Sequence, residues 1–323
     1  MVKSRPMSPR KPKVKIDIVI PVYNEEGVIE QTHANLREVI DSLPCDFTIY
    51  YVDDGSTDAT ADSLDALAGS DKRIVVLEFS TNFGHQAALT AGLDASRGEF
   101  VISMDADGQH PPQMIPEMIH LFVQGYDIVQ AQRIDDQSRS FKQATSATFY
   151  KLINQISGTQ MIPGAADFRG LSRQAVDALK AMPEYHRFLR GMVSWIGYKS
   201  IILPYHETKR VAGRTKYNLG KMVRLAMDAI FSFSLVPLYL GLSAGVFFMI
   251  LAAVQILSVV YLWATHQNEL IIPGWTSVLT LMLIGNGIIM ILLGFIGVYV
   301  GYVFQEVKRR PVYLLKKGKH ESG

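Results

Sequence analysis

Two long stretches near the carboxyl end of this 323-residue chain contain no charged side chain; they cover residues 229–265 and 270–305. Each is longer than the roughly 20 apolar residues that a helix needs to cross a bilayer. A buried hairpin in a soluble core is the alternative, but helices of soluble domains rarely run past about 25 residues without polar interruption. The pattern therefore predicts two membrane-spanning helices, at about 233–264 and 275–304.

Basic residues flank this apolar region on both sides. Six lysines and arginines lie between positions 209 and 224, six more lie between 308 and 319, and residues 266–270 contain none. Because loops on the cytoplasmic side carry the excess of Lys and Arg, both flanks are predicted to be cytoplasmic. We also expect a membrane-surface amphipathic helix at 217–232 and a basic cytoplasmic tail at 306–323.

The first two-thirds of the chain alternates between short apolar runs and helical patterns. The expected strands are 16–21, 47–52, 74–79, 100–104 and 128–131, with helices at 26–42, 57–67, 87–95 and 114–124 between them. This alternation is typical of an α/β domain with a mostly parallel sheet that is covered on both faces. Beyond residue 136 we expect a helix at 140–156, a strand at 168–171, a helix at 174–180 and a strand at 201–205. The domain is predicted to cover 16–216, after a disordered basic arm at 1–15.

Two carboxylates follow the fourth predicted strand, in the segment Asp-Ala-Asp-Gly-Gln-His-Pro-Pro at 105–112. Ligands of open α/β sheets bind outside the carboxyl ends of the strands, and carboxylates placed there are costly unless they hold a cation. Oxygen ligands suit Mg²⁺ or Mn²⁺, which are commonly shared with substrate phosphates. A turn rich in Asp and Gly is the alternative reading of Asp105 and Asp107.

Carboxylates also follow the first two predicted strands, at Glu25 and at Asp53 and Asp54. Parallel strands end at one edge of a sheet, so these groups are expected to lie near Asp105 and Asp107. They can accept hydrogen bonds from a ribose hydroxyl or a base N–H. A nucleoside diphosphate with its cation satisfies this arrangement, while Asp58 is better explained as a helix cap.

Four segments together resemble the inverting glycosyltransferases with a GT-A fold. They are Val-Ile-Pro-Val-Tyr-Asn-Glu-Glu (19–26), Val-Asp-Asp-Gly-Ser-Thr-Asp (52–58), Asn-Phe-Gly-His-Gln-Ala-Ala (82–88) and the segment at 105–112. More narrowly, residues 15–315 resemble polyprenyl-phosphate glycosyltransferases, such as dolichol-phosphate mannose synthase and the bacterial bactoprenol glucosyltransferases. The resemblance implies a GT-A domain followed by a two-helix transmembrane hairpin.

The resemblance also implies a role for each matching position. Pro21, Tyr23, Glu25, Asp53 and Asp54 would hold the uridine and ribose of a UDP-sugar. Asp105, Asp107 and Gln109 would organise Mg²⁺ or Mn²⁺ on the diphosphate. Residues 82–88 would lie near the nucleotide or sugar, and for His85 a structural role is an equal alternative.

The acceptor, a polyprenyl phosphate such as undecaprenyl phosphate, needs cations because it approaches a diphosphate. Arg offers a bidentate fork for phosphate. Asp167 is a candidate for orienting the acceptor or acting as a base, although a phosphate monoester is already nucleophilic at neutral pH. The expected acceptor ligands are Arg133, Arg169, Arg210, Arg214 and Lys216.

The expected protein is thus a multi-pass enzyme of the bacterial inner membrane that modifies lipopolysaccharide or cell-wall glycan. UDP-glucose is the first expected donor; no nucleic-acid partner is expected, and glycines in the spans are compatible with a homo-oligomer. A catalytically silent scaffold or sugar-nucleotide sensor and a processive polysaccharide synthase are the alternatives. A synthase would carry Gln-x-x-Arg-Trp, and a dinucleotide-binding enzyme would carry Gly-x-Gly-x-x-Gly after the first strand; neither motif occurs at the expected place.

Overall fold

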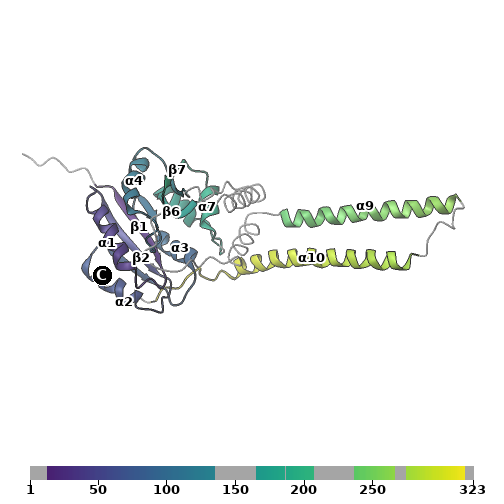
Figure 1. Ribbon diagram of the computed structural model, residues 1–323, viewed down its shortest axis with the longest axis horizontal. Helices are drawn as coiled ribbons and strands as arrows, with labels where there is room; N and C mark the ends of the chain where they lie inside the picture. Colours follow the sequence, from purple (N-terminus) through teal and green to yellow (C-terminus); the bar gives the residue numbers. More distant parts are fainter. Residues whose placement is uncertain (1–12, 135–164, 186, 207–235, 266–273, 317–323) are drawn as a thin grey trace, which may run out of the picture. The chain divides into compact units, whose positions relative to one another are not determined.

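The computed structural model describes residues 13–134, 165–185, 187–206, 236–265 and 274–316. The chain divides into two compact units. The first contains an α/β domain together with residues 311–316, and the second contains two long helices (Figure 1).

A seven-stranded sheet forms the centre of the first unit, in the order β3-β2-β1-β4-β6-β5-β7. Every strand runs in the same direction except β6, which is antiparallel to both of its neighbours. The amino end of β6 therefore lies at the edge where β1, β2, β4 and β5 end. The strands are β1 (Lys15–Val22), β2 (Asp46–Asp53), β3 (Ile74–Glu78), β4 (Phe100–Ser103), β5 (Ile128–Arg133), β6 (Ala165–Ser172) and β7 (Ser200–Tyr205).

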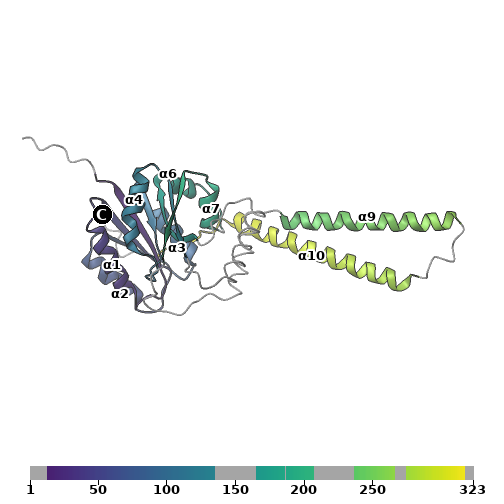
Figure 2. The same ribbon diagram turned by 45° about the horizontal axis from the view of Figure 1, so that its top comes forward.

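Helices cover both faces of this sheet. In Figure 2, α1, α2 and α4 lie on one side of the sheet, and α3 and α7 lie on the other. The bounds are α1 (Ile29–Ile40), α2 (Thr60–Ser70), α3 (His85–Ala95), the 3₁₀ turn η1 (Pro112–Met114), α4 (Ile115–Val123), α6 (Arg173–Lys180) and α7 (Leu189–Trp195). The continuous apolar strands follow from this double coverage, because side chains on both faces are removed from water.

The side chains of β1 alternate between the two faces of the sheet, so they pack into two different cores. Ile16, Ile18 and Ile20 belong to the cluster that includes residues of α1, α2 and α4. Val19 points to the opposite face, where Gly92 of α3 approaches it so closely that a Cβ on Gly92 would lie 2.2 Å from a Val19 methyl group. The missing side chain lets α3 pack directly on β1, which fixes the position of the amino end of α3 beside the strand ends.

The predicted α/β architecture with a mostly parallel sheet is confirmed. One helix, α7, was not predicted, because its seven residues contain a glycine and show little periodicity. The helices expected at 140–156 and 217–232 lie outside the described residues, as does most of the basic arm.

The second unit contains α9 (Val236–Ala264) and α10 (Trp275–Lys308), which contact each other. Both helices occupy the ranges expected for membrane spans. Among the described residues, one stretch, Ile284–Lys308, is long and apolar enough to cross a membrane by length and composition. A second span, and with it the transmembrane hairpin, is not confirmed and stays a prediction.

Candidate active site

The loops after β1 and β2 are joined by hydrogen bonds at the carboxyl edge of the sheet. The backbone N–H of Asn24 donates to Ser56 Oγ at 3.0 Å, and the side-chain oxygen of Asn24 accepts from the N–H of Thr57 at 2.8 Å. The N–H of Glu25 donates to Thr60 Oγ1 at 2.9 Å. These bonds fix the segment that carries Tyr23, which is exposed, and Glu25 beside the start of α2. Pro21 is buried within β1.

Asp53 and Asp54 are both buried but have different surroundings. Oδ1 of Asp53 accepts from the backbone N–H and the hydroxyl of Ser56, whereas its Oδ2 is buried with no hydrogen-bond partner among the described residues. Burial raises the pKa of Asp53, and the bonds from Ser56 oppose that rise. Asp53 therefore keeps one buried acceptor oxygen for a ligand.

The carboxylate of Asp54 is occupied by the loop that follows β3. It accepts from the N–H of Phe83 at 2.7 Å, from the N–H of Gly84 at 2.9 and 3.1 Å, and from the side-chain amide of Asn82 at 3.0 Å. The loop approaches closely because residue 55 is glycine: its φ is +67°, and a Cβ there would lie 2.6 Å from the carbonyl carbon of Thr81. In this structure Asp54 organises loop 82–84.

The Asp-Ala-Asp segment follows β4, and the buried side chain of His110 supports it from the core of the domain. Nδ1 of His110 accepts the backbone N–H of Asp105 at 2.8 Å. The His110 ring is 5% exposed and stacks on Phe168 at a centroid distance of 5.0 Å. Further along the turn, Asp107 accepts the N–H of Gln109 at 3.1 Å. The core of the domain thus positions Asp105.

Asp105 has the features expected of a cation ligand. Its Oδ1 is buried and accepts no hydrogen bond from the described residues, although the side chain as a whole is 33% exposed. Nε2 of His85 lies 3.6 Å from this oxygen, beyond hydrogen-bond distance. A buried carboxylate oxygen without a hydrogen bond is costly unless a cation offsets its charge. Among the described residues, no group of three or more His, Cys, Asp and Glu side chains is placed to hold a metal ion. Asp105 and Asp107 offer hard oxygen donors, but two carboxylates are fewer ligands than Mg²⁺ or Mn²⁺ takes, so such an ion would need further oxygen ligands.

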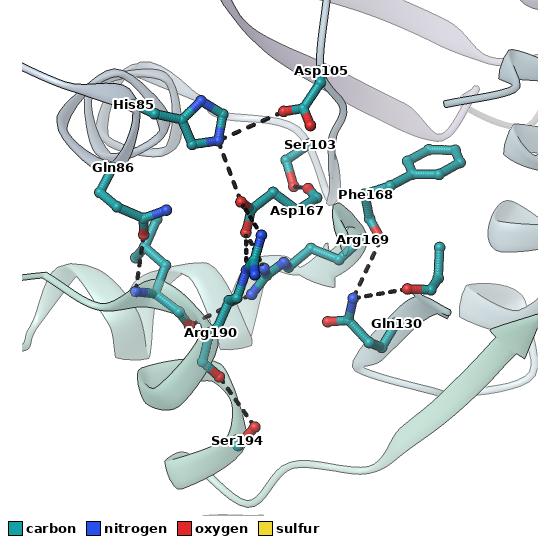
Figure 3. Close-up of polar contacts among 12 residues, drawn as sticks. His85, Gln86, Ser103, Asp105, Gln130, Asp167, Phe168, Arg169, Arg190 and Ser194 are labelled. Carbon is teal, nitrogen blue, oxygen red and sulfur yellow. Dashed lines mark hydrogen bonds and ion pairs between the residues drawn. The ribbon is translucent and has the colours of Figure 1, made fainter. Parts of the chain in front are cut away.

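An ion cluster lies beside Asp105, around the buried carboxylate of Asp167 (Figure 3). Arg169 contacts its Oδ1 at 2.6 Å, and Arg190 contacts both oxygens, at 3.1 and 2.9 Å. Nε2 of His85 lies 3.3 Å from Asp167 Oδ2 and 3.6 Å from Asp105 Oδ1. The reversed strand β6 makes this possible, because it brings Asp167 to the end of β4, where Ser103 Oγ donates to the Asp167 carbonyl at 2.6 Å.

The charges in this cluster stabilise Asp167 as an anion. Burial would raise its pKa, but Arg190, His85 and Arg169 outweigh burial and hold the pKa of Asp167 well below its usual range. Burial opposes a charge on His85, yet its bond to Asp167 and the charge of Asp105 raise the pKa of His85. A carboxylate held by three cationic partners is a poor proton acceptor at neutral pH.

The predicted acceptor arginines occupy different environments. Arg133 is exposed at the carboxyl end of β5, at the same edge as the other site residues. Arg169 is 3% exposed and paired with Asp167, so burial limits its access to a ligand. Arg210, Arg214 and Lys216 lie outside the described residues.

Two site residues were not identified from the sequence. His110 lies inside the predicted metal segment, but only the structure shows that its ring supports Asp105. Arg190 lies on α7, and its side chain is 26% exposed, which makes it more accessible than Arg169. The arginine-rich segment around α7 is a signal that could have indicated Arg190, although such residues are also common on surfaces.

Several known proteins match this chain over most of its length. The model of glycosyl transferase family 2 matches residues 17–180. A prophage bactoprenol glucosyl transferase homolog of Escherichia coli is 38% identical over 311 residues, which cover 95% of this chain and 100% of that protein. The bactoprenol glucosyl transferase of Shigella phage SfX is 37% identical over 311 residues, with the same coverage.

A Bacillus subtilis protein described as an uncharacterized glycosyltransferase is 38% identical over 305 residues, 94% of each chain. Among solved structures, a glucosyl-3-phosphoglycerate synthase from Mycobacterium tuberculosis has a TM-score of 0.45 and 19% identity, over 68% of this chain and 79% of that chain. Our conclusions about the family rest on the sequence matches, which cover nearly the whole chain, and not on this distant structural likeness.

Proposed function

This chain belongs to glycosyl transferase family 2, and from that premise we propose that it transfers a sugar from a UDP-sugar to a polyprenyl phosphate at the cytoplasmic face of a bacterial inner membrane. UDP-glucose is the first donor to test, and undecaprenyl phosphate is the first acceptor. The product would be a polyprenyl-phosphate sugar used to modify cell-envelope glycan.

The observation that carries this proposal is the buried Oδ1 of Asp105, which accepts no hydrogen bond from the described residues and lies 3.6 Å from His85 Nε2, beside the Asp167 ion cluster. In the proposed site a cation and a diphosphate would bind at Asp105, and the cationic side chains of the ion cluster lie within a few ångströms of this residue. The relatives named for bactoprenol glucosyl transfer match about 95% of this chain, so the comparison includes both the sheet domain and the apolar carboxyl-terminal region.

The donor half of the proposed site lies at the ends of β1, β2 and β4. Oδ2 of Asp53 is the acceptor we assign to a ribose hydroxyl or a base N–H. Tyr23 follows β1 and is 38% exposed, and we assign its ring to stacking on the uracil. Pro21 and Glu25 shape the same loop. Asp54 acts on the donor through loop 82–84, which it holds by four hydrogen-bond contacts.

Asp105 and Asp107, with Gln109, are the residues that would hold Mg²⁺ or Mn²⁺. Such an ion, when bound, stabilises negative charge on the departing diphosphate. The contribution of the protein is to fix the two carboxylates: His110 supports Asp105 from the core, and the backbone N–H of Gln109 restrains Asp107. Fixed ligands lose little freedom when the donor binds, which favours electrostatic stabilisation of the reaction.

The proposed reaction is a single displacement. A phosphate oxygen of the acceptor attacks the anomeric carbon, the bond from that carbon to UDP breaks, and UDP leaves with the electron pair. Attack from the face opposite UDP inverts the anomeric configuration. The attacking phosphate needs no base at neutral pH, and Asp167 is engaged by cations, so we assign Asp167 as the counter-ion that orients His85 and Arg190.

Acceptor phosphate would meet cations at the carboxyl edge of the sheet. Arg133 is exposed and the Arg190 side chain is 26% exposed, while Arg169 is buried and supports Asp167 from the interior. Arg210, Arg214 and Lys216 complete the proposed set from the basic flank. The apolar stretch in α10 is the part of the described chain that suits a lipid environment, where the acceptor resides.

Sugar transfer by the purified, detergent-solubilised protein tests this proposal directly. Undecaprenyl phosphate and Mg²⁺ are incubated with each of several radiolabelled UDP-sugars, and the label in the lipid extract is counted. Transfer from one UDP-sugar that depends on the lipid supports the proposal. Binding of a UDP-sugar with no transfer to any polyprenyl phosphate would instead favour a sugar-nucleotide sensor.

A further inference from the structure

Residues 311–316, directly after α10 in the sequence, pair with the end of β3 in the sheet domain. Leu315 forms an isolated antiparallel bridge with Phe79. The N–H of Ser80 donates to the Leu314 carbonyl at 2.9 Å, and the N–H of Lys316 donates to the Glu78 carbonyl at 2.8 Å. The ammonium group of Lys316 also pairs with the Glu78 carboxylate.

Tyr313 is the side chain through which this segment contacts the core. Its ring stacks on Phe79 at a centroid distance of 5.2 Å and an interplanar angle of 8°. Its hydroxyl donates to Asp94 of α3 at 3.1 Å. Burial, with the nearby charge of Asp94, raises the pKa of Tyr313 to about 12, so the hydroxyl keeps its proton at neutral pH.

Phe79 links Tyr313 to the proposed donor site. Phe79 is 0% exposed, and its other ring contact is with Phe83, edge-on at 5.6 Å. The N–H of Phe79 donates to the Asp53 carbonyl at 2.9 Å, while the N–H of Phe83 donates to the Asp54 carboxylate at 2.7 Å. The stacked pair Tyr313–Phe79 and the edge-on pair Phe79–Phe83 therefore connect residues 311–316 to the backbone that carries both aspartates.

We propose that Tyr313 is a positioning residue for the donor nucleotide: its ring holds Phe79, and through Phe79 it holds loop 80–84 and the aspartates at the end of β2. This inference rests on the proposed function for the identity of the ligand. It assigns a role in donor binding to a residue that lies more than 200 positions from the rest of the donor site in the sequence. The segment that leaves the apolar helix α10 is then part of the nucleotide site.

A purely structural edge cover is the competing explanation, because β3 is an outer strand whose free backbone groups would otherwise be exposed. The two explanations differ in what they predict for folded protein. If residues 311–316 only cover the edge of β3, substitutions there lower the melting temperature and leave the dissociation constant for UDP unchanged. A positioning role changes the dissociation constant for UDP at temperatures where every variant is fully folded.

Four full-length proteins in detergent separate these cases: wild type, Tyr313→Leu, Tyr313→Phe and Leu314→Ala. Phe keeps the stacking and removes only the bond to Asp94. Leu314 is the matched control, since its side chain is 52% exposed and its carbonyl bond survives substitution. UDP with Mg²⁺ is titrated by calorimetry, and amide hydrogen exchange of residues 79–84 is measured without nucleotide.

We expect Tyr313→Leu to weaken UDP binding about tenfold, because aromatic pairs of this kind contribute on that scale. Exchange at residues 79–84 should rise, while exchange in β5 stays at the wild-type rate. The KM for the UDP-sugar should rise while kcat changes by less than about threefold, since Asp105 and Asp107 are not touched. Tyr313→Phe and Leu314→Ala should remain close to wild type.

A second pair of variants tests the backbone contact of the same segment. Lys316→Ala removes only an exposed ion pair, whereas Lys316→Pro also removes the N–H that bonds Glu78, so only Pro should increase exchange at 79–84. Wild-type UDP affinity and unchanged exchange in Tyr313→Leu would overturn the proposal. If the wild-type protein binds no UDP, the donor assignment fails, and the exchange rates alone decide whether Tyr313 positions the loop.

Discussion

Nδ1 of His110 accepts the backbone N–H of Asp105 at 2.8 Å, so a buried ring that stacks on Phe168 sets the position of the first carboxylate of the Asp-Ala-Asp segment. A side chain that is 5% exposed thereby determines the position of a proposed cation ligand.

Replacing His110 with Phe should preserve the stacking and leave the N–H of Asp105 without its acceptor. An unsatisfied buried donor costs about 1–3 kcal/mol. We expect transfer activity to require a higher Mg²⁺ concentration in the His110→Phe variant, and a titration of activity with Mg²⁺ measures this. An unchanged Mg²⁺ requirement would show that the ring does not position Asp105.

Asp105→Asn and Asp107→Asn should each abolish sugar transfer while the protein remains folded and in the membrane. The reason is that a neutral amide is a weaker ligand for a divalent cation than a carboxylate. Radiolabel transfer at saturating Mg²⁺ and at saturating Mn²⁺ is the measurement, with Asp94→Asn on α3 as the control. Full activity of both variants would remove the cation site from the model.

Asp167→Asn should destabilise the domain, because it leaves the buried guanidinium of Arg169 without its anion. Breaking a buried ion pair from one side typically costs about 3–5 kcal/mol. The double variant Asp167→Asn with Arg169→Met should regain much of the lost melting temperature, since the unpaired charge is gone. A single variant that melts at the wild-type temperature would show that the Asp167–Arg169 pair does not stabilise the domain.

Arg190→Ala should impair use of the lipid acceptor more than binding of UDP. A charge-assisted contact contributes roughly 1.5–3 kcal/mol, which corresponds to a loss of about 10- to 100-fold in kcat/KM for the acceptor. Lys should rescue only partly, because it lacks the planar fork of Arg. Arg97→Ala, at the amino end of β4, is the control; equal acceptor dependence in both Ala variants would refute the assignment.

Asp71 provides a pH test of stability away from the site. The side-chain bond from Arg73, opposed by burial, lowers the pKa of Asp71 to about 2, below its value of 3.8 in the unfolded chain. The unfolded state binds the proton more readily, so this stabilisation is complete above pH 4 and is lost as the pH falls through 2. Its size is roughly 2 kcal/mol at pH 7 and about half of that at pH 3.

The melting temperature of Asp71→Asn should therefore lie well below that of the wild type at pH 7, and the gap should shrink at pH 3. Near-ultraviolet circular dichroism follows the aromatic side chains of the sheet domain during unfolding. A gap that is constant between these pH values would mean that the Asp71 charge does not stabilise the folded domain.

The sheet was predictable because its strands include short apolar runs, and β1, β2 and β4 are buried on both faces. The Asp-Ala-Asp segment could also be predicted as part of a binding site, because carboxylates directly after a buried strand have few structural explanations. Contacts between distant segments could not be predicted from one sequence. Nothing in the local pattern indicates that Asp54 binds loop 82–84, or that Asp167 is already paired with Arg190.

The carboxyl-terminal residues also make a contact with a distant segment that could not be predicted. Residues 311–316 looked like part of a basic tail, because Lys and Arg surround them, yet Tyr313 lies against Phe79. Such pairing depends on where the end of β3 lies in space. Helix α7 was missed because seven residues give too little periodicity, although it carries Arg190.

The reversed direction of β6 has a consequence for how such a protein can diversify. Because β6 enters the site from the far side of the sheet, the residues proposed to contact the donor come from positions 21–109, and those proposed for the acceptor come from position 133 onward. Tyr313, which supports the donor residues through Phe79, is the exception in the second half of the chain. Recombination near the middle of the coding sequence would exchange the acceptor contacts and leave the direct donor contacts intact, provided that the incoming part keeps an aromatic ring at position 313.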